Sequence, residues 1–331
     1  MILVARPEER FSRVSLGYHY EICGIRLESE IPLSSLQRRG APATGAADPV
    51  KLRIAAAAPI PEPSEWIVTR TYHDVAIPYL SVARLEDGYL VRVHDQVDFH
   101  INDTGSEIVC SAAEGVPALT IEQLLLDQIL PQVLHLLGRP PLHASAVALG
   151  PGSVVAFLGR SGMGKSTLAA SFAAEPGAEA SLVSDDCLAL SLTPRGVEVR
   201  SSYPSARLRP DAADALFHER GLALASPRAD KLRVDLEPPG GELLLERVYV
   251  LEAGDAAPTI TRLSRRDGIA ALAGHLHRLD PGDRRRLAGE LARLEAIVNR
   301  VAVARLVYRR SFEDLPAVRA AIRADIRPAA A

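Results

Sequence analysis

Lysine and long apolar runs are scarce in this chain. Only Lys51, Lys165 and Lys231 of its 38 basic residues are lysine, so a lysine indicates a position where a compact ammonium is wanted instead of a guanidinium. No apolar stretch reaches the roughly 18 residues that a membrane span requires. The first residues, MILVARPEERFSR, are too soon interrupted by charge for a signal peptide. We therefore expect a cytoplasmic protein that does not bind a membrane.

Cysteine and excess positive charge are also lacking. Cys23, Cys110 and Cys187 lie far apart and show neither metal-ligand spacing nor a C-x-x-C pair, and Cys187 is expected to be a small buried hydrophobe. The formal net charge of −3 lacks the basic excess of a dedicated nucleic-acid binder. At 331 residues, the chain is long enough for two globular domains.

Strand signals dominate the first part of the chain. Short apolar runs recur between residues 50 and 112, and apolar and polar residues alternate on both sides of Glu86-Asp87-Gly88. Such alternation around Asp-Gly is typical of a β-hairpin. We predict a mainly antiparallel β or α+β domain over residues 1–117. Because this segment contains no phosphate motif or metal cluster, we expect it to recognise an acceptor or to build a homo-oligomer.

A helical pattern over residues 118–141 is expected to connect two domains. Thr120 is its predicted N-cap, Gly138 its stop signal, and Pro131 should kink it. His135 lies in the apolar pattern and is expected to pack instead of binding a ligand. From residue 142 to 326, strands alternate with helices, which predicts a parallel or mixed sheet flanked by helices.

A complete phosphate-binding motif opens this second domain. The sequence GRSGMGKST at 159–167 matches G-x-x-x-x-G-K-[ST] between the apolar strand VVAFL and a helix. Glycines let successive backbone N–H groups point at an anion, and the following helix adds its positive end. Lys165 is expected to neutralise the β- and γ-phosphates of ATP, and the Ser166 hydroxyl to ligate Mg²⁺. The predicted nucleotide-binding residues are Gly159, Ser161, Gly162, Met163, Gly164, Lys165, Ser166 and Thr167.

An acidic pair ends the next predicted strand, LVSDD. In a parallel sheet, the carboxyl end of that strand lies at the same edge as the phosphate loop. One carboxylate could hold the metal while the other accepts a proton from an attacking hydroxyl. Asp185 is the predicted acid/base and Asp186 the residue nearer the metal, with the reverse assignment left open. His143, in the strand before the loop, could reach the pair and tune its pKa.

This arrangement resembles the bacterial HPr kinase/phosphorylase family, whose catalytic domain also resembles phosphoenolpyruvate carboxykinase. The shared order is a strand with His143, the GRSGMGKST loop, and a strand ending in Asp-Asp. The resemblance implies an α/β P-loop kinase domain over residues 142–326 that uses ATP and Mg²⁺. It also implies a metal contact for Glu198 and a role for Arg200, since Glu198-Val-Arg200 is similar to the family's Glu-x-Arg. The glycine-rich continuation of that signature is replaced here by SSYPSARLRP.

Over the whole chain, the likeness is closer to a divergent branch, the HPr kinase-related proteins. The segments in common are GIRLESEIPL at 24–33, the HASAV strand at 143–147, SARLRPD at 205–211 and Asp230-Lys231. Members of this branch occur in biosynthetic clusters for ribosomally made peptides, including lasso peptides. There the kinase is understood to phosphorylate the C-terminal residue of the precursor. The resemblance therefore implies a serine kinase with a peptide acceptor.

Cations follow the acidic strand closely in the chain. Such side chains could hold a carboxylate of the acceptor or the transferring phosphoryl group, and ordinary surface ion pairs are the alternative. The leading hypothesis is a kinase acting on a hydroxyl of a peptide or small acceptor. A nucleotide-binding regulator, and an HPr serine kinase or carboxykinase-like enzyme, remain as alternatives. The candidate cations are Arg207, Arg209, Arg228, Lys231 and Arg233.

Overall fold

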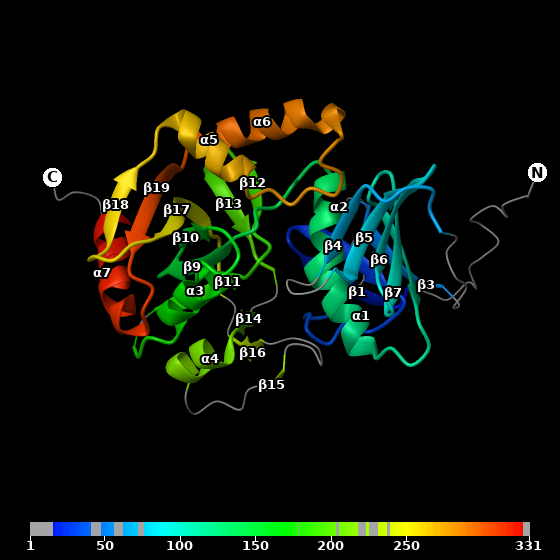
Figure 1. Cartoon of the computed structure of the whole chain (residues 1–331), viewed down its shortest axis with the longest axis horizontal. Helices are drawn as coiled ribbons and strands as arrows, with labels where there is room; N and C mark the ends of the chain where they lie inside the picture. The colour runs from blue at the N-terminus through cyan, green and yellow to red at the C-terminus, as the bar shows by residue number, and fades with distance from the viewer. Residues whose placement is uncertain are drawn as a thin grey trace, which may run out of the picture. The chain divides into compact units, whose positions relative to one another are not determined.

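Both halves of the chain are built on β-sheets, and together they make a mixed α/β molecule (Figure 1). The computed structural model describes residues 16–40, 48–55, 62–71, 76–177, 179–202, 205–217, 223–224, 231–236 and 239–326. The chain divides into an N-terminal unit and a C-terminal unit. The N-terminal unit contains Met1–Leu137 and Arg278–Gly282, and the C-terminal unit contains Gly138–His277 and Asp283–Ala331.

The N-terminal unit contains an eight-stranded sheet in the order β1-β2-β3-β8-β7-β6-β5-β4. Only the β2–β3 and β3–β8 pairs are parallel, so the sheet is mainly antiparallel. The predicted hairpin is confirmed as β5 and β6. The first residue of β6 is Gly88. A side chain is excluded at this position, because a Cβ would lie 2.1 Å from the Ile101 carbonyl oxygen. The strands are β1 (Tyr18–Ile22), β2 (Ile25–Ser29), β3 (Val50–Ile54), β4 (Val68–Thr71), β5 (Pro78–Arg84), β6 (Gly88–Val93), β7 (Val97–Asn102) and β8 (Glu107–Ala112).

One interrupted helix completes the N-terminal unit. It runs through α1 (Ala118–Leu124), the π-helical turn η2 (Leu125–Ile129) and α2 (Leu130–Leu136). The π-turn lies directly before Pro131, whose missing N–H cannot continue an α-helical hydrogen-bond ladder. The predicted N-cap at Thr120 is wrong, because the helix begins earlier, after Pro117. Gly138 follows the helix with φ 73°, as a stop signal should. Buried His135 accepts a hydrogen bond from the Leu279 N–H at Nδ1, 3.3 Å away.

The main sheet of the C-terminal unit has the core order β11-β9-β10-β17-β19-β18. β9 is antiparallel to both β10 and β11, so β10 and β11 run in the same direction. β17 and β19 are parallel to β10. The carboxyl ends of β10, β11, β17 and β19 therefore meet at one edge, together with the start of β9. The strands are β9 (Ser145–Leu149), β10 (Ser153–Leu158), β11 (Ala180–Ser184), β17 (Leu244–Ala253), β18 (Thr259–Arg262) and β19 (Ala302–Tyr308).

Two smaller β-structures adjoin this sheet. The hairpin of β12 (Ala189–Thr193) and β13 (Gly196–Arg200) pairs with β17 at Glu198 and Leu244. A separate three-stranded sheet has the order β14-β16-β15, formed by β14 (Ser205–Leu208), β16 (Leu232–Asp235) and β15 (Ala223–Leu224). β14 carries Arg207, one of the candidate cations.

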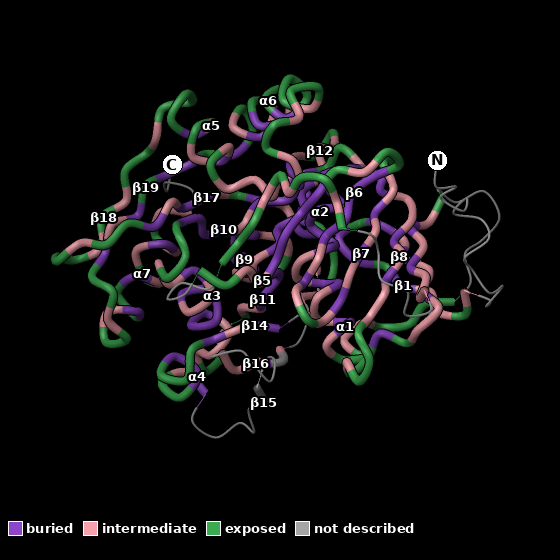
Figure 2. The backbone as a smooth tube through the Cα atoms, turned by 45° about the vertical axis from the view of Figure 1, so that its right-hand side comes forward, coloured by how far each residue is buried: buried purple, intermediate pink, exposed green. Residues whose placement is uncertain are grey.

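Helices cover both faces of the C-terminal sheet. α3 (Lys165–Ala173), α4 (Pro210–Phe217) and α7 (Leu315–Ile326), which follows the short turn η3 (Phe312–Asp314), share one core with Phe157 and Tyr249. α5 (Arg265–Ala273) and α6 (Arg284–Val298) cover the other face, over Ala156 and Val248. Because both faces are covered, β10 is buried along nearly its whole length (Figure 2). That rigid strand holds the loop that follows it.

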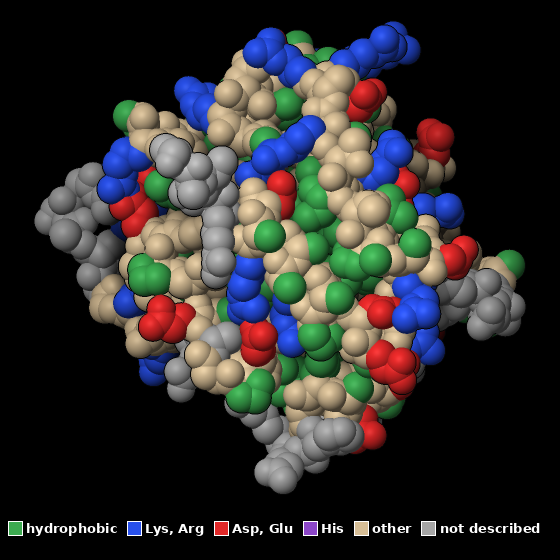
Figure 3. All heavy atoms as spheres, turned by 90° about the vertical axis from the view of Figure 1, so that its left-hand side faces the viewer, with side chains coloured by type: hydrophobic (Ala, Val, Ile, Leu, Met, Phe, Trp, Pro, Cys, Tyr) green, Lys and Arg blue, Asp and Glu red, His purple; other side chains and the backbone are tan. Residues whose placement is uncertain are grey.

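Surface charge on the C-terminal unit is mixed. On the face drawn in Figure 3, Lys and Arg side chains lie among Asp and Glu side chains. The exposed Arg305–Glu252 pair is an example, with 3.1 Å between Nε and Oε1. Within the described part of the chain, no helix combines the length and apolar character that crossing a bilayer would need.

Candidate functional site

The phosphate-binding motif forms a tight turn between β10 and α3. Gly162 and Gly164 adopt left-handed backbone conformations, with φ 79° and 86°, which side chains other than glycine rarely accept. Gly164 is the N-cap of α3. Lys165 is buried, and its Nζ donates to the Gly159 carbonyl oxygen at 3.0 Å. The loop is thus preformed around the ammonium group, with the N-terminus of a nine-residue helix directed into it.

The remaining loop residues are more accessible than Lys165. Ser161 and Gly162 are exposed, whereas Met163, Ser166 and Thr167 are partly buried. Burial lowers the pKa of the Lys165 ammonium, and nearby Lys231 lowers it further, while Asp186 and Asp185 oppose the shift. A bound phosphate would supply the negative charge that best stabilises this ammonium.

Tyr308 supports the loop from the end of β19, and the sequence did not single it out. Its side chain is buried, and its hydroxyl donates to the Met163 carbonyl oxygen at 3.4 Å. A Cβ added to Gly164 would lie 3.4 Å from this hydroxyl. The only signal in the sequence was its place at the end of a predicted strand. Its contact with the loop spans 145 residues and depends on the sheet order.

Asp185 is a buried carboxylate with both oxygens engaged. Its side chain is 2% exposed. Oδ1 accepts from the Ser145 hydroxyl at 2.6 Å, and Oδ2 accepts from the Arg207 backbone N–H at 3.0 Å. Burial, together with the neighbouring Asp186, raises the pKa of Asp185. These contacts tie β11 to β9 and β14, so Asp185 holds the edge of the site together.

Asp186 is the accessible member of the pair, with a side chain 27% exposed. Its Oδ2 accepts from the Arg207 guanidinium at 3.2 Å. Burial acts to raise the pKa of Asp186, but the positive charges of Arg207, Lys231 and Lys165, together with protonated His143 at acid pH, outweigh it and hold the pKa below its usual value. Asp186 is therefore ionised at neutral pH and faces the lysine of the phosphate loop. Of the two aspartates, Asp186 is thus the one whose carboxylate is open to a ligand, and which of them acts as acid/base stays a prediction.

Two histidines, His143 and His277, lie against Asp186, and a third, His275, interacts with Lys165; only His143 was predicted. His143 Nε2 lies 3.9 Å from Asp186 Oδ1. Burial and the charge of Lys165 lower the pKa of His143 to about 4, so its imidazole is neutral at pH 7. The ring of His277 meets that of His143 edge-on at 5.3 Å. His275 also senses Lys165, because burial first and then that charge lower its pKa. The H-x-H spacing in AGHLHR was the available signal for these two residues.

Of the predicted substrate cations, the structure brings two to the pair. Arg207 contacts both aspartates, and Lys231 lies within electrostatic range of Asp186 and Lys165. Arg209 is exposed, and no contact joins it to either aspartate among the described residues. Arg233 lies opposite Arg207 in the β14–β16 ladder. Arg228 and Asp230 lie outside the residues that the structure describes.

Glu198 and Arg200 are not brought to the phosphate loop. Glu198 is buried and pairs with the Arg200 guanidinium at 2.5 Å. It lies opposite Leu244, which itself lies opposite Ser153, the first residue of β10. The phosphate loop follows the last residue of β10, about 16 Å further along the strand at a rise of about 3.3 Å per residue. The arrangement offers Glu198 no route to the metal position predicted for it.

The donors near Lys165 suit Mg²⁺ better than a transition metal. Ser166 supplies a hydroxyl and Asp186 a carboxylate, and oxygen ligands are those that Mg²⁺ prefers. Among the described residues, no group of three or more His, Cys, Asp or Glu side chains is arranged to hold a metal ion. Mg²⁺ typically takes one or two carboxylates and completes its shell with water and substrate phosphates. These residues therefore fit a magnesium that arrives with a nucleotide.

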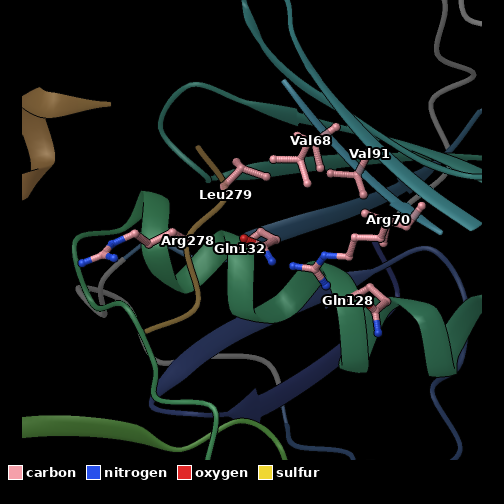
Figure 4. A pocket seen from close by; sticks show the side chains of 9 residues that line it. Val68, Arg70, Val91, Gln128, Gln132, Arg278 and Leu279 are labelled. Atoms are coloured by element: carbon pink, nitrogen blue, oxygen red, sulfur yellow. The ribbon is translucent and has the colours of Figure 1, made fainter. Parts of the chain in front are cut away.

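The N-terminal unit has a cavity of its own, between β4–β6 and the η2–α2 helix (Figure 4). Its volume of ≈ 10 Å³ holds about one water molecule, which leaves no room for a nucleotide. Gln132 lies in the wall with a buried Oε1 that accepts no hydrogen bond from the described residues. Arg278 and Leu279 also line it, and they directly follow His277 in the chain.

Comparison with known proteins adds no identification. No protein-family model matches the chain, and no curated protein is significantly similar to it. The chemistry must therefore be inferred from the residues at the carboxyl edge of the C-terminal sheet. That edge combines a phosphate-binding loop, a buried lysine, an accessible carboxylate and a guanidinium that contacts the carboxylate.

Proposed function

We propose that this protein is an ATP- and Mg²⁺-dependent kinase whose C-terminal unit has an HPr kinase-like P-loop fold. The reaction transfers the γ-phosphate to a hydroxyl. One observation carries the proposal: the phosphate loop after β10 and Asp186 after β11 open on the same edge of the sheet. The proposal uses the Asp186 carboxylate on that edge as the base, a group that a nucleotide-binding regulator would not require.

In the proposed reaction, Lys165 and the loop N–H groups hold the phosphates. Asp186 accepts a hydrogen bond from the acceptor hydroxyl and takes its proton as the oxygen bonds to the γ-phosphorus. The bond from the γ-phosphorus to the β,γ-bridging oxygen breaks, and ADP leaves. Phosphoryl transfer passes through a loose transition state in which positioning and charge stabilisation dominate. A carboxylate with a lowered pKa therefore suffices, because its main task is to orient the hydroxyl.

Magnesium would be held by the Ser166 hydroxyl, phosphate oxygens of the nucleotide, and Asp186. When bound, it neutralises the charge that develops on the β- and γ-phosphates. Arg207 keeps Asp186 ionised and is well placed to contact the transferring phosphoryl group. Asp185 fixes Arg207 and β9 around this arrangement through its two hydrogen bonds.

The proposed acceptor is the C-terminal serine of a lasso-type precursor peptide. Two considerations support it: the resemblance to HPr kinase-related proteins, and the cations near Asp186. Arg207 and Lys231 could each make a charge-assisted contact with a peptide carboxylate, a class of hydrogen bond worth about 1.5–3 kcal/mol. A small hydroxy acid presents the same carboxylate and hydroxyl, so the peptide assignment depends on the resemblance.

The test is mass spectrometry of candidate acceptors after incubation with the protein, ATP and Mg²⁺. The candidates are a short precursor peptide encoded beside the gene, its terminal Ser→Ala variant, and HPr. We expect one added phosphate on the terminal residue of the peptide and none on the Ala variant. Phosphorylation of HPr alone, or hydrolysis of ATP with every acceptor, would overturn the peptide assignment. Absence of ATP binding would overturn the kinase proposal itself.

A further inference from the structure

Three distant segments of the C-terminal unit form a narrow strip of backbone hydrogen bonds beside the acidic pair. Leu142 and Leu188 exchange hydrogen bonds in both directions, at 3.0 and 2.9 Å. On the other side, the His143 N–H donates to the His275 carbonyl oxygen at 2.7 Å. The His277 N–H donates to the Pro141 carbonyl oxygen at 2.9 Å. The strip fixes residues 275–277 relative to the turn that contains Asp186.

The turn at Asp186 has an unusual backbone that needs external support. Asp186 adopts φ 65°, a left-handed conformation that few non-glycine residues accept, although aspartate tolerates it better than most. The carbonyl oxygen of Asp186 lies 2.9 Å from His277 Nε2. A carbonyl can only accept, so Nε2 must carry the hydrogen and donate it. This bond connects residues that are 91 positions apart.

We propose that His277 is a positioning residue that sets the direction of the Asp186 carboxylate through this hydrogen bond. The inference rests on the proposed function, because it assigns Asp186 as the reactive carboxylate. Rotation of the Asp186 peptide group would turn the side chain away from Lys165. The hydrogen bond from His277 opposes that rotation.

His277 is the last residue of the C-terminal unit before the chain enters the N-terminal unit at Arg278. Arg278–Gly282 belongs to the N-terminal unit. There, Leu279 is buried and donates its N–H to His135, and Asp280 pairs with Arg84 at 3.6 Å. Leu279 and Gln132 both line the cavity of that unit (Figure 4). One peptide bond therefore links His277 to a segment anchored in the N-terminal unit, and we expect the anchoring of Leu279 to help hold His277 in place.

Two substitutions separate hydrogen bonding from packing. His277→Phe keeps a ring against His143 but has no donor, whereas His277→Gln keeps a donor N–H. We expect His277→Phe to lower kcat for Mg-ATP turnover about tenfold, the scale of one oriented hydrogen bond, with KM for ATP nearly unchanged. Amide hydrogen exchange at residues 185–188 should accelerate in the same variant. His277→Gln should restore most of both quantities.

A second pair tests the connection to the N-terminal unit. Leu279→Ala loosens the anchored segment and should accelerate exchange at residues 185–188. Val82→Ala removes bulk from the same cavity wall, on β5, and should leave that exchange unchanged.

Equal exchange in wild type and His277→Phe would overturn the positioning role, as would equal losses in the Phe and Gln variants. Equal effects of Leu279→Ala and Val82→Ala would overturn the connection. Exchange is measurable without turnover, so an inactive wild type would count against the kinase proposal alone.

Discussion

Among the described residues, each unit contains a carboxylate residue that is only 2% exposed, and the surroundings of the two differ. Glu122 in the N-terminal unit is 2% exposed and accepts three hydrogen bonds, from the Ser34 N–H, the Ser34 hydroxyl and the Ser35 N–H. Asp185 in the C-terminal unit is equally buried and accepts two. Both carboxylates tie a distant segment to their own element.

The difference lies in what surrounds each carboxylate. The hydrogen bonds of Glu122 hold the loop that contains Ser34 and Ser35. Asp185 precedes an accessible carboxylate, Asp186, which faces Lys165 and Arg207. A buried and hydrogen-bonded carboxylate thus indicates a structural tie. Under the proposed function, the accessible carboxylate among cations beside the loop is the group that takes part in the chemistry. The predictions below test that distinction, beginning with the largest expected effect.

Removing the lysine of the phosphate loop should have the largest effect. Lys165→Ala should lower kcat/KM for ATP by about 10²–10³-fold, because an electrostatic contact to the transferring group is lost. Lys51→Ala in the N-terminal unit serves as the matched control and should leave the rate unchanged. Calorimetry with Mg-ATP and a coupled ADP assay measure both. An unchanged affinity and rate in Lys165→Ala would contradict the site.

The two aspartates should separate in their effects. Asp186→Asn tolerates the same left-handed backbone and should reduce phosphoryl transfer by at least about 10²-fold, the lower end for general acid–base catalysis. Its melting temperature should stay close to that of wild type. Asp185→Asn should lower the melting temperature, because the Arg207 N–H and the Ser145 hydroxyl would compete for one acceptor oxygen. Full transfer by Asp186→Asn would remove the proposed base.

In the N-terminal unit, Glu122→Gln is the counterpart of Asp185→Asn and should affect only the stability of the fold. Glu122→Gln replaces one acceptor oxygen by an amide that faces N–H donors, which should cost about 1–3 kcal/mol of unfolding free energy. Urea unfolding followed by circular dichroism measures the loss. Mg-ATP affinity in native buffer should remain at the wild-type value. A large loss of affinity would mean that the two buried carboxylates are not distinct in role.

A smaller effect is expected on the pH dependence of stability, from Asp283 at the start of α6. Asp283 caps the Arg285 N–H, and its hydrogen bond to the Arg285 guanidinium lowers its pKa to about 2. A lowered carboxyl pKa gives stability that is present above the unfolded value near 4 and is lost as pH falls through about 2. Asp283→Ala should cost about 1 kcal/mol at pH 7, with the difference from wild type shrinking toward pH 2. Asp283→Asn should keep a cap that does not titrate in this range.

The smallest effect is expected from thiol reagents. All three cysteines are buried and none is in a disulfide, and burial raises the pKa of Cys110 to about 12. Because the thiolate is the reactive form, native protein at pH 8 should react slowly with a disulfide reagent at every thiol. Denatured protein should titrate three thiols. Rapid reaction of Cys187 in the native state would show that the turn after Asp186 opens readily.

Local patterns predicted the elements that depend on neighbouring residues. The hairpin at Gly88, the strand before Gly159 and the α3 helix were all visible in short windows of sequence. The helix start at Thr120 was wrong because Pro117 provides an earlier N-terminus. The π-turn before Pro131 was not visible, since only packing decides how a helix accommodates a proline.

The site could be predicted only as far as its motifs extend. The loop and the acidic pair each occupy a few consecutive residues, and strand direction places them at one edge. Which aspartate stays accessible depends on Ser145 and Arg207, and those contacts exist only after β9 and β14 pack beside β11. Tyr308 and His277 contact residues of the site that are over 90 positions away in the chain, so their contacts could not be predicted from neighbouring residues.

The position of β17 in the sheet also has a consequence for folding during synthesis. β17 lies between β10 and β19, yet it follows the phosphate loop only after α3 and β11–β16 have been synthesised. A nascent chain that has just exposed the loop lacks the strand that braces it. Parallel pairs between such distant segments have high contact order and form slowly. ATP would stabilise only the completed unit, by mass action, so its binding can serve as a reporter of finished folding.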